Sequence, residues 1–225
     1  MVAMTTGRQT GLMPNPLPAY ASPVKLLVAV SGGGTTLRNL LHVISSGRLA
    51  ARVVHVVASR DGIGGVEIAN EAAIPWTVLP RAEYETVADY GRAFFRIADT
   101  TGCDLVVMGG FLAQVEVPPS FENRVLNIHP SLIPAFCGKG YYGLRVHRAV
   151  LERGCRVSGC TAHLVDNEYD HGPIIDQRVV AVEPHDTPES LAARVFDAEC
   201  ELYPTAIAAV ASGTLTLEGR RLVQA

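Results

Sequence analysis

Continuous apolar runs alternate with segments of helical spacing through the first half of the chain. Runs of Val, Leu, Ile and Ala predict strands buried on both faces, the type found in parallel sheets. We expect such strands at residues 24–31, 52–59, 76–79, 105–108 and 125–128. Apolar residues three and four positions apart predict helices at residues 35–46, 66–73 and 83–101. This alternation is typical of an α/β fold with a mostly parallel, doubly wound sheet.

The pattern changes after residue 135. Residues 136–143 are rich in glycine and aromatic side chains and predict a loop, followed by a helix at 144–153. Two neighbouring strands, at 158–165 and 174–182, predict antiparallel additions to the same sheet. A long helix is expected at 188–212, bent at Pro204, and a small hairpin after Thr214.

The first 23 residues differ from the rest, because they contain four prolines and no periodic apolar pattern. We interpret residues 1–23 as an extension, mobile or laid over the surface, and residues 24–225 as a single domain. The early apolar runs are far shorter than the roughly 20 residues that a membrane span requires.

Composition narrows the class of protein. Hydrophobic residues make up 48% of the 225 positions, enough to bury a sizeable core. The net charge of -3 argues against a nucleic-acid coat protein or a polybasic membrane binder, so we expect neither partner. The five cysteines lack any C-x-x-C spacing, which favours reduced thiols in a cytoplasmic protein without a zinc cluster. A monomer or homodimer is expected.

In doubly wound sheets, ligands bind beyond the carboxyl ends of the strands. That rule selects residues 31–36, 108–115 and 127–134. The first segment is Ser31-Gly32-Gly33-Gly34-Thr35-Thr36, with Thr35 or Thr36 capping the next helix. Leu37 stands where a dinucleotide fingerprint needs its third glycine, and no Walker A motif is present. The segment therefore predicts a turn that binds a phosphate monoester. The alternative is a tight turn between strand and helix that binds no ligand.

The third segment, Asn127-Ile128-His129-Pro130-Ser131, supplies an amide and an imidazole two residues apart on one side of a strand. Both can stabilise a developing oxyanion in acyl chemistry. Asp170 would favour the imidazolium form of His129 and orient it, although Asp166, Glu168 and Asp176 are competitors. The alternatives are that His129 is a structural histidine at a strand end and that Asp170 is an ordinary turn aspartate. Among the other histidines, His147 is expected on the surface or in packing. His163 is expected in the core, with a place in the lining of the site as the alternative.

These segments together resemble the phosphoribosylglycinamide formyltransferase family of the folate-dependent formyltransferase superfamily. The resemblance runs from about residue 25 to residue 212. It rests on the glycine loop, on N-x-H-P-S-L-x-P at 127–134 and on D-x-G-P at 170–173. It implies a Rossmann-like formyltransferase fold and formyl transfer from 10-formyltetrahydrofolate, a reduced folate, to the amine of glycinamide ribonucleotide, without a metal.

The resemblance also implies roles at matching positions. Asn127, His129 and Asp170 would be catalytic, with His129 the general acid. The ribonucleotide phosphate would bind at Gly33, Gly34, Thr35, Thr36 and Leu37, and Glu199 would contact the ribonucleotide. The folate would lie against Leu112, Ala113, Gln114, Val115, Asn127, Val165 and Asp166.

Some positions depart from that family. Val87 and Ala113 stand where many members have arginines near the folate, and Thr36 replaces a common asparagine. Lys139 lies in the long 136–143 loop. It is a candidate for contacting an anionic group, and the alternative is a solvated loop lysine without a ligand. Three other functions stay open: formyl transfer to a different amine, hydrolysis of the formyl donor, and nucleotide binding without catalysis.

Overall fold

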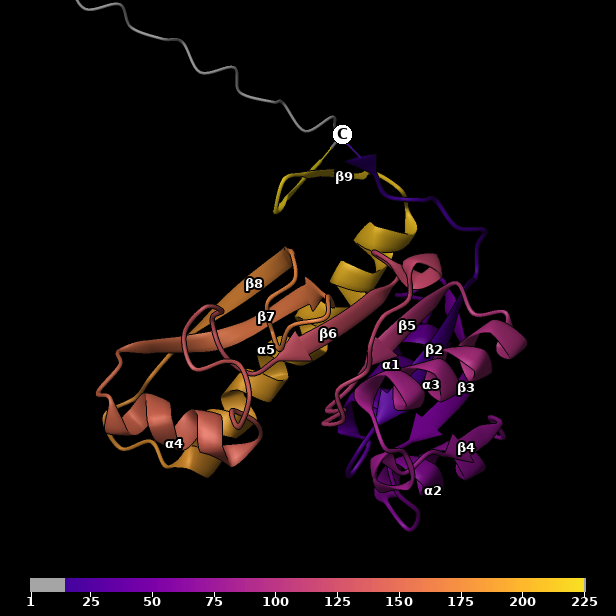
Figure 1. Ribbon diagram of the computed structural model, residues 1–225. Helices are drawn as coiled ribbons and strands as arrows, with labels where there is room; N and C mark the ends of the chain where they lie inside the picture. Colours follow the sequence, from indigo (N-terminus) through magenta and orange to yellow (C-terminus); the bar gives the residue numbers. More distant parts are fainter. Residues whose placement is uncertain (1–14, 225) are drawn as a thin grey trace, which may run out of the picture.

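The computed structural model describes residues 15–224, and their strands form one ten-stranded sheet (Figure 1). The strand order is β1-β9-β10-β8-β7-β6-β5-β2-β3-β4. The parallel part comprises β2 (Val24–Val30), β3 (Ala51–Ala58), β4 (Trp76–Val78), β5 (Leu105–Met108) and β6 (Val125–His129). The side chains of β2 are almost all buried, as expected for a strand covered on both faces. The predicted doubly wound core is therefore confirmed.

The second half extends this sheet with antiparallel strands, also as predicted. β7 (Val157–Leu164) pairs antiparallel with β6 and with β8 (Ile174–Ala181). β9 (Leu215–Glu218) and β10 (Arg221–Gln224) form the expected hairpin, and β10 meets β8 in parallel at its first residue.

The described part of the extension packs on this hairpin. β1 (Asn15–Pro16) pairs with β9, and the Leu17 side chain is buried in the main core. Residues 1–14 of the expected extension lie outside the described residues. The division of the chain at residue 23 stays a prediction.

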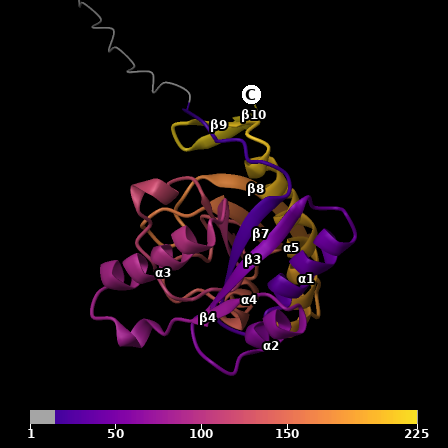
Figure 2. The ribbon, with the colours of Figure 1, turned by 90° about the vertical axis from the view of Figure 1, so that its right-hand side faces the viewer.

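Five α-helices cover the sheet: α1 (Thr35–Ser45), α2 (Gly64–Glu71), α3 (Val87–Thr101), α4 (Leu144–Glu152) and α5 (Pro188–Ala211). Figure 2 shows α3 on one face of the sheet and α1 and α5 on the other. α5 starts with a capping box of Thr187 and Ser190 and continues through Pro204. No helix within residues 15–224 is long and apolar enough to cross a membrane.

Three helix starts differ from the sequence expectation. Gly34, with φ 72°, caps α1, so neither threonine side chain has the predicted capping role. α2 starts two residues early, at Gly64, because Gly64 and Gly65 pack closely on the loop before α1. α3 starts at Val87, since residues 81–83 form a separate 3-10 turn and the Thr86 hydroxyl accepts a hydrogen bond from the Asp89 N–H.

Candidate active site

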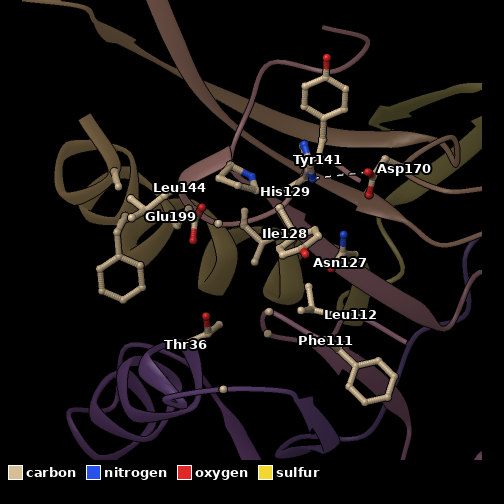
Figure 3. A pocket seen from close by; sticks show the side chains of 18 of the residues that line it. Thr36, Phe111, Leu112, Asn127, Ile128, His129, Tyr141, Leu144, Asp170 and Glu199 are labelled. Atoms are coloured by element: carbon tan, nitrogen blue, oxygen red, sulfur yellow. Dashed lines mark ion pairs between the residues drawn. The ribbon is translucent and has the colours of Figure 1, made fainter. Parts of the chain in front are cut away.

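Two adjoining cavities lie beyond the carboxyl ends of β2, β5 and β6. Figure 3 shows the larger one. The larger has a volume of about 640 Å³ and the smaller about 70 Å³. Phe111, Asn127, Tyr169 and Asp170 line both cavities and therefore mark their junction. All three strand-end segments selected from the sequence contribute to these walls, as the general rule for doubly wound sheets predicts.

The glycine loop forms one wall of the larger cavity, with Gly32, Gly33, Gly34, Thr35 and Thr36 lining it. The first backbone N–H groups of α1 have no carbonyl partner one turn earlier and carry the positive end of the helix dipole. The Leu37 side chain is fully buried in the core. Only the Leu37 backbone N–H remains available to a ligand.

His129 ends β6 with both ring nitrogens facing oxygen atoms. Nδ1 lies 3.5 Å from Asp170 Oδ2, and Nε2 lies 3.0 Å from the Phe136 carbonyl oxygen. The side chain is 5% exposed, so the neighbouring carboxylate acts with little screening by water. The two contacts hold the His129 ring in one orientation.

The D-x-G-P turn carries Asp170 to His129 from the loop between β7 and β8. Asp170 adopts the left-handed conformation with φ 51°, which aspartate tolerates better than most residues. Gly172 is required because a Cβ there would lie 1.9 Å from the Leu164 carbonyl oxygen. The Gly138 N–H donates to Asp170 Oδ2 at 2.8 Å. The turn and the 136–143 loop thus hold the carboxylate in place from two sides.

His163 fixes the amide of Asn127, its antiparallel partner across β6 and β7. Burial lowers the pKa of His163, which favours the neutral ring. Its Nδ1–H donates to the Leu164 carbonyl at 2.8 Å, so Nε2 accepts from Asn127 Nδ2 at 3.1 Å. Nε2 is 3.8 Å from Asp170 Oδ1, beyond hydrogen-bond distance, in agreement with an unprotonated Nε2. The second N–H of Asn127 is left for a ligand.

Glu199 is the charged side chain that α5 places at the larger cavity. It lines the larger cavity, and burial raises the pKa of its carboxyl to about 7. Lys139 also lines this cavity, where it is the one lysine or arginine among the described lining residues. One turn beyond Glu199, the Tyr203 hydroxyl lies 2.9 Å from both the Met108 and Leu126 carbonyl oxygens. It ties the carboxyl end of β5 to β6 at the residue before Asn127.

The residues expected around the folate divide between the two cavities. Leu112 lines the larger one and is 52% exposed. The smaller cavity is lined by Ala113, Gln114, Val115, Val165 and Asp166. Its described lining contains three carboxylates, from Asp166, Glu168 and Asp170, and no lysine or arginine. Residues 165–170, which line this cavity, are anchored through Asn167, whose Oδ1 accepts a hydrogen bond from the Val117 N–H at 2.8 Å.

Two histidines outside the predicted catalytic group border the cavities. His147 lines the larger cavity and is 3% exposed, which agrees with the packing alternative and not with the surface alternative. Burial and nearby His129 lower its pKa. His163 is buried as expected and also borders the smaller cavity, the other possibility that the sequence left open. The register of β6 and β7 pairs it with Asn127.

No group of three or more His, Cys, Asp or Glu side chains within residues 15–224 is arranged to hold a metal ion. All five cysteines are free, and Cys160 is buried with a pKa raised to about 12.

Comparisons with known proteins place this site in a family. The sequence profile of the family described as formyl transferase matches residues 24–207. A chloroplastic phosphoribosylglycinamide formyltransferase of Arabidopsis thaliana is 43% identical over 191 residues, covering 83% of this chain and 65% of that protein. The corresponding protein of Vigna unguiculata is 42% identical, and the match covers 60% of its length. The chain therefore spans somewhat less than two thirds of these plant relatives.

Solved structures agree with the fold. Glycinamide ribonucleotide transformylase 1 from Symbiobacterium toebii superposes with a TM-score of 0.82 at 37% identity, covering 89% of this chain and 93% of that one. A formyltetrahydrofolate deformylase from Pseudomonas syringae has a TM-score of 0.77 at 23% identity, covering 89% and 65%. The second likeness shows the fold alone.

Proposed function

The chain belongs to the formyl transferase family, and we propose that it transfers a formyl group from 10-formyltetrahydrofolate to the amine of 5'-phosphoribosylglycinamide in de novo purine biosynthesis. One observation carries the proposal. The Asn127, His129 and Asp170 group stands at the junction of two cavities, one of which starts at a glycine loop and helix N-terminus. Two substrates entering from opposite sides would meet at this group.

The larger cavity suits the ribonucleotide. Its phosphate would accept hydrogen bonds from backbone N–H groups at Gly33, Gly34, Thr35, Thr36 and Leu37, where the α1 dipole favours negative charge. Glu199, on the same wall, would contact the ribonucleotide. The glycyl amine would then point toward the junction between the cavities.

The smaller cavity and its mouth suit the reduced folate. Leu112, Ala113, Gln114 and Val115 supply one wall, and Val165 and Asp166 supply the other, with Asn127 between them. The mixture of apolar side chains and fixed polar groups is typical of a small-molecule site. The formyl group would lie against the junction.

The chemistry requires a hydrogen-bond donor for the formyl oxygen and a proton for the leaving nitrogen. The amine attacks the formyl carbon, a C–N bond forms, and negative charge develops on the oxygen. The free Asn127 N–H and the His129 imidazolium would stabilise that oxyanion. The bond from carbon to folate N10 then breaks, and His129 passes a proton to that nitrogen. The neutral imidazole left behind takes up the proton that the attacking amine loses, which restores the imidazolium. Because His129 Nε2 bonds the Phe136 carbonyl, this transfer requires the 136–143 loop to release it.

The test is the rate of tetrahydrofolate formation from 10-formyltetrahydrofolate, with and without 5'-phosphoribosylglycinamide. We expect product only with the acceptor, and strong loss in His129→Asn and Asp170→Asn proteins. The exposed His185 and Asp99 provide matched controls, His185→Asn and Asp99→Asn, that should keep wild-type turnover. Product without an acceptor would indicate a hydrolase and refute the proposal.

The free cysteines support a cytoplasmic location, where thiols stay reduced. Fractionation of the source cells with an antibody to the chain would test it. A monomer or homodimer stays a prediction, which the molar mass in solution would decide.

A further inference from the structure

Two helices support the cavity walls without placing a side chain in either cavity. No residue of α2 or α3 is among those lining the two cavities. Each helix nevertheless contacts the backbone of one wall, and each does so at a glycine. The glycine allows helix and wall to approach more closely than any side chain would permit.

α2 contacts the glycine loop. A Cβ at Gly64 would lie 2.8 Å from the Gly33 carbonyl oxygen and 3.2 Å from Gly33 Cα. The neighbouring Gly65 N–H donates to the Gly32 carbonyl at 3.1 Å. The first turn of α2 therefore sets the position of the peptide groups on either side of Gly33, on the wall of the larger cavity.

α3 contacts the other wall. A Cβ at Gly91 would lie 2.7 Å from the Glu116 carbonyl oxygen and 2.9 Å from the Glu116 nitrogen. Glu116 directly follows residues 113–115, which line the smaller cavity. Gly91 is buried, so a methyl group added there has no free space to turn into.

We propose that Gly64 and Gly91 are positioning residues with separate duties, Gly64 for the ribonucleotide and Gly91 for the folate. The inference rests on the proposed function, because that function assigns one substrate to each wall. Favourable non-bonded contacts lie at about 3.5 Å or more, so a methyl at either position displaces its wall by roughly 0.7–0.8 Å. A misplacement of about 1 Å can cost a hundredfold in rate, so a smaller displacement should cost about tenfold.

The experiment compares Gly64→Ala and Gly91→Ala proteins by calorimetric binding of each substrate alone and by the KM for each substrate. We expect Gly64→Ala to weaken 5'-phosphoribosylglycinamide binding about tenfold and to leave tetrahydrofolate binding within twofold. Gly91→Ala should do the reverse. A merely structural role would move both substrates together, or neither.

Gly213→Ala is the matched control. Gly213 has φ 69°, and a Cβ there would lie 2.7 Å from the Ala19 Cβ, at the junction of α5 with the extension. This variant carries a comparable overlap outside both cavities, so its thermal midpoint should fall while both dissociation constants stay unchanged.

The proposal is overturned if a folded Gly64→Ala or Gly91→Ala protein binds both substrates as the wild type does, or loses both equally. If Gly64→Ala does not fold, the selectivity of Gly91→Ala decides the question by itself. The binding readout also separates this proposal from the proposed function. A wild-type protein that binds both substrates without formyl transfer refutes the function and leaves the binding comparison decisive. A wild-type protein that binds neither substrate refutes both.

Discussion

Glu199 makes the stability of the protein depend on pH in a way that one substitution should remove. Its carboxyl lies on the cavity wall, and within residues 15–224 it forms no ion pair or side-chain hydrogen bond. Burial raises its pKa from 4.5 to about 7. The perturbation is Glu199→Gln, which keeps the shape of the side chain and removes its charge.

The sign follows from the raised pKa. The folded protein holds this proton more tightly than the unfolded chain, so the associated stability is complete below pH 4.5 and is lost as pH rises through about 7. Each pKa unit corresponds to about 1.4 kcal/mol, which sets an upper limit of about 3 kcal/mol for this shift. The side chain is partly exposed in an open cavity, and screening by water reduces the expected effect to about 1–2 kcal/mol.

The assay is urea unfolding of both proteins at pH 5 and at pH 8.5. We expect similar unfolding free energies at pH 5, and a Glu199→Gln protein that is about 1–2 kcal/mol more stable than the wild type at pH 8.5. Taking the difference between the two proteins removes the titration of every other group. Parallel pH profiles would refute the reasoning, because they would mean that the carboxyl ionises equally easily in both states.

Other predictions concern the core and the catalytic group. Tyr203→Phe should lower the unfolding free energy by about 1–3 kcal/mol, since it removes the one hydroxyl proton that the Met108 and Leu126 carbonyl groups share. Thermal unfolding checks it, with about 2–4 °C expected per kcal/mol. Phe94→Ala should lower the unfolding free energy, measured with urea, by about 3–5 kcal/mol, because the ring is fully buried in the core between α3 and the sheet. His129→Asn should lower turnover at least about a hundredfold with the thermal midpoint kept, whereas His185→Asn should keep both.

Local pattern was sufficient to predict the layout of the sheet and most helices. The apolar run at β2 and the segment ending in His129 are short, continuous and rich in β-branched residues, which favours buried strands. Because strand ends determine where a doubly wound sheet binds ligands, the three site segments also followed from the sequence. The roles assigned to their residues remain predictions.

The parts that sequence reasoning missed depend on contacts between distant segments. The cap of α1 and the start of α2 are set by glycine packing between Gly34 and Gly65, which no helical period records. The pairing of Asn127 with His163 depends on strand register, and the pairing of β1 with β9 joins the two ends of the chain. For His147 the sequence left surface and packing open, because its helix position alone does not reveal the cavity beside it.

The most direct test of the account follows the formyl group itself. The protein would be incubated with 5'-phosphoribosylglycinamide and 10-formyltetrahydrofolate carrying ¹³C in the formyl group, and the products would be identified by NMR. The account predicts that the label becomes an amide on the glycinamide nitrogen, in an amount equal to the tetrahydrofolate released. Label recovered as free formate, or left on the folate, would contradict it.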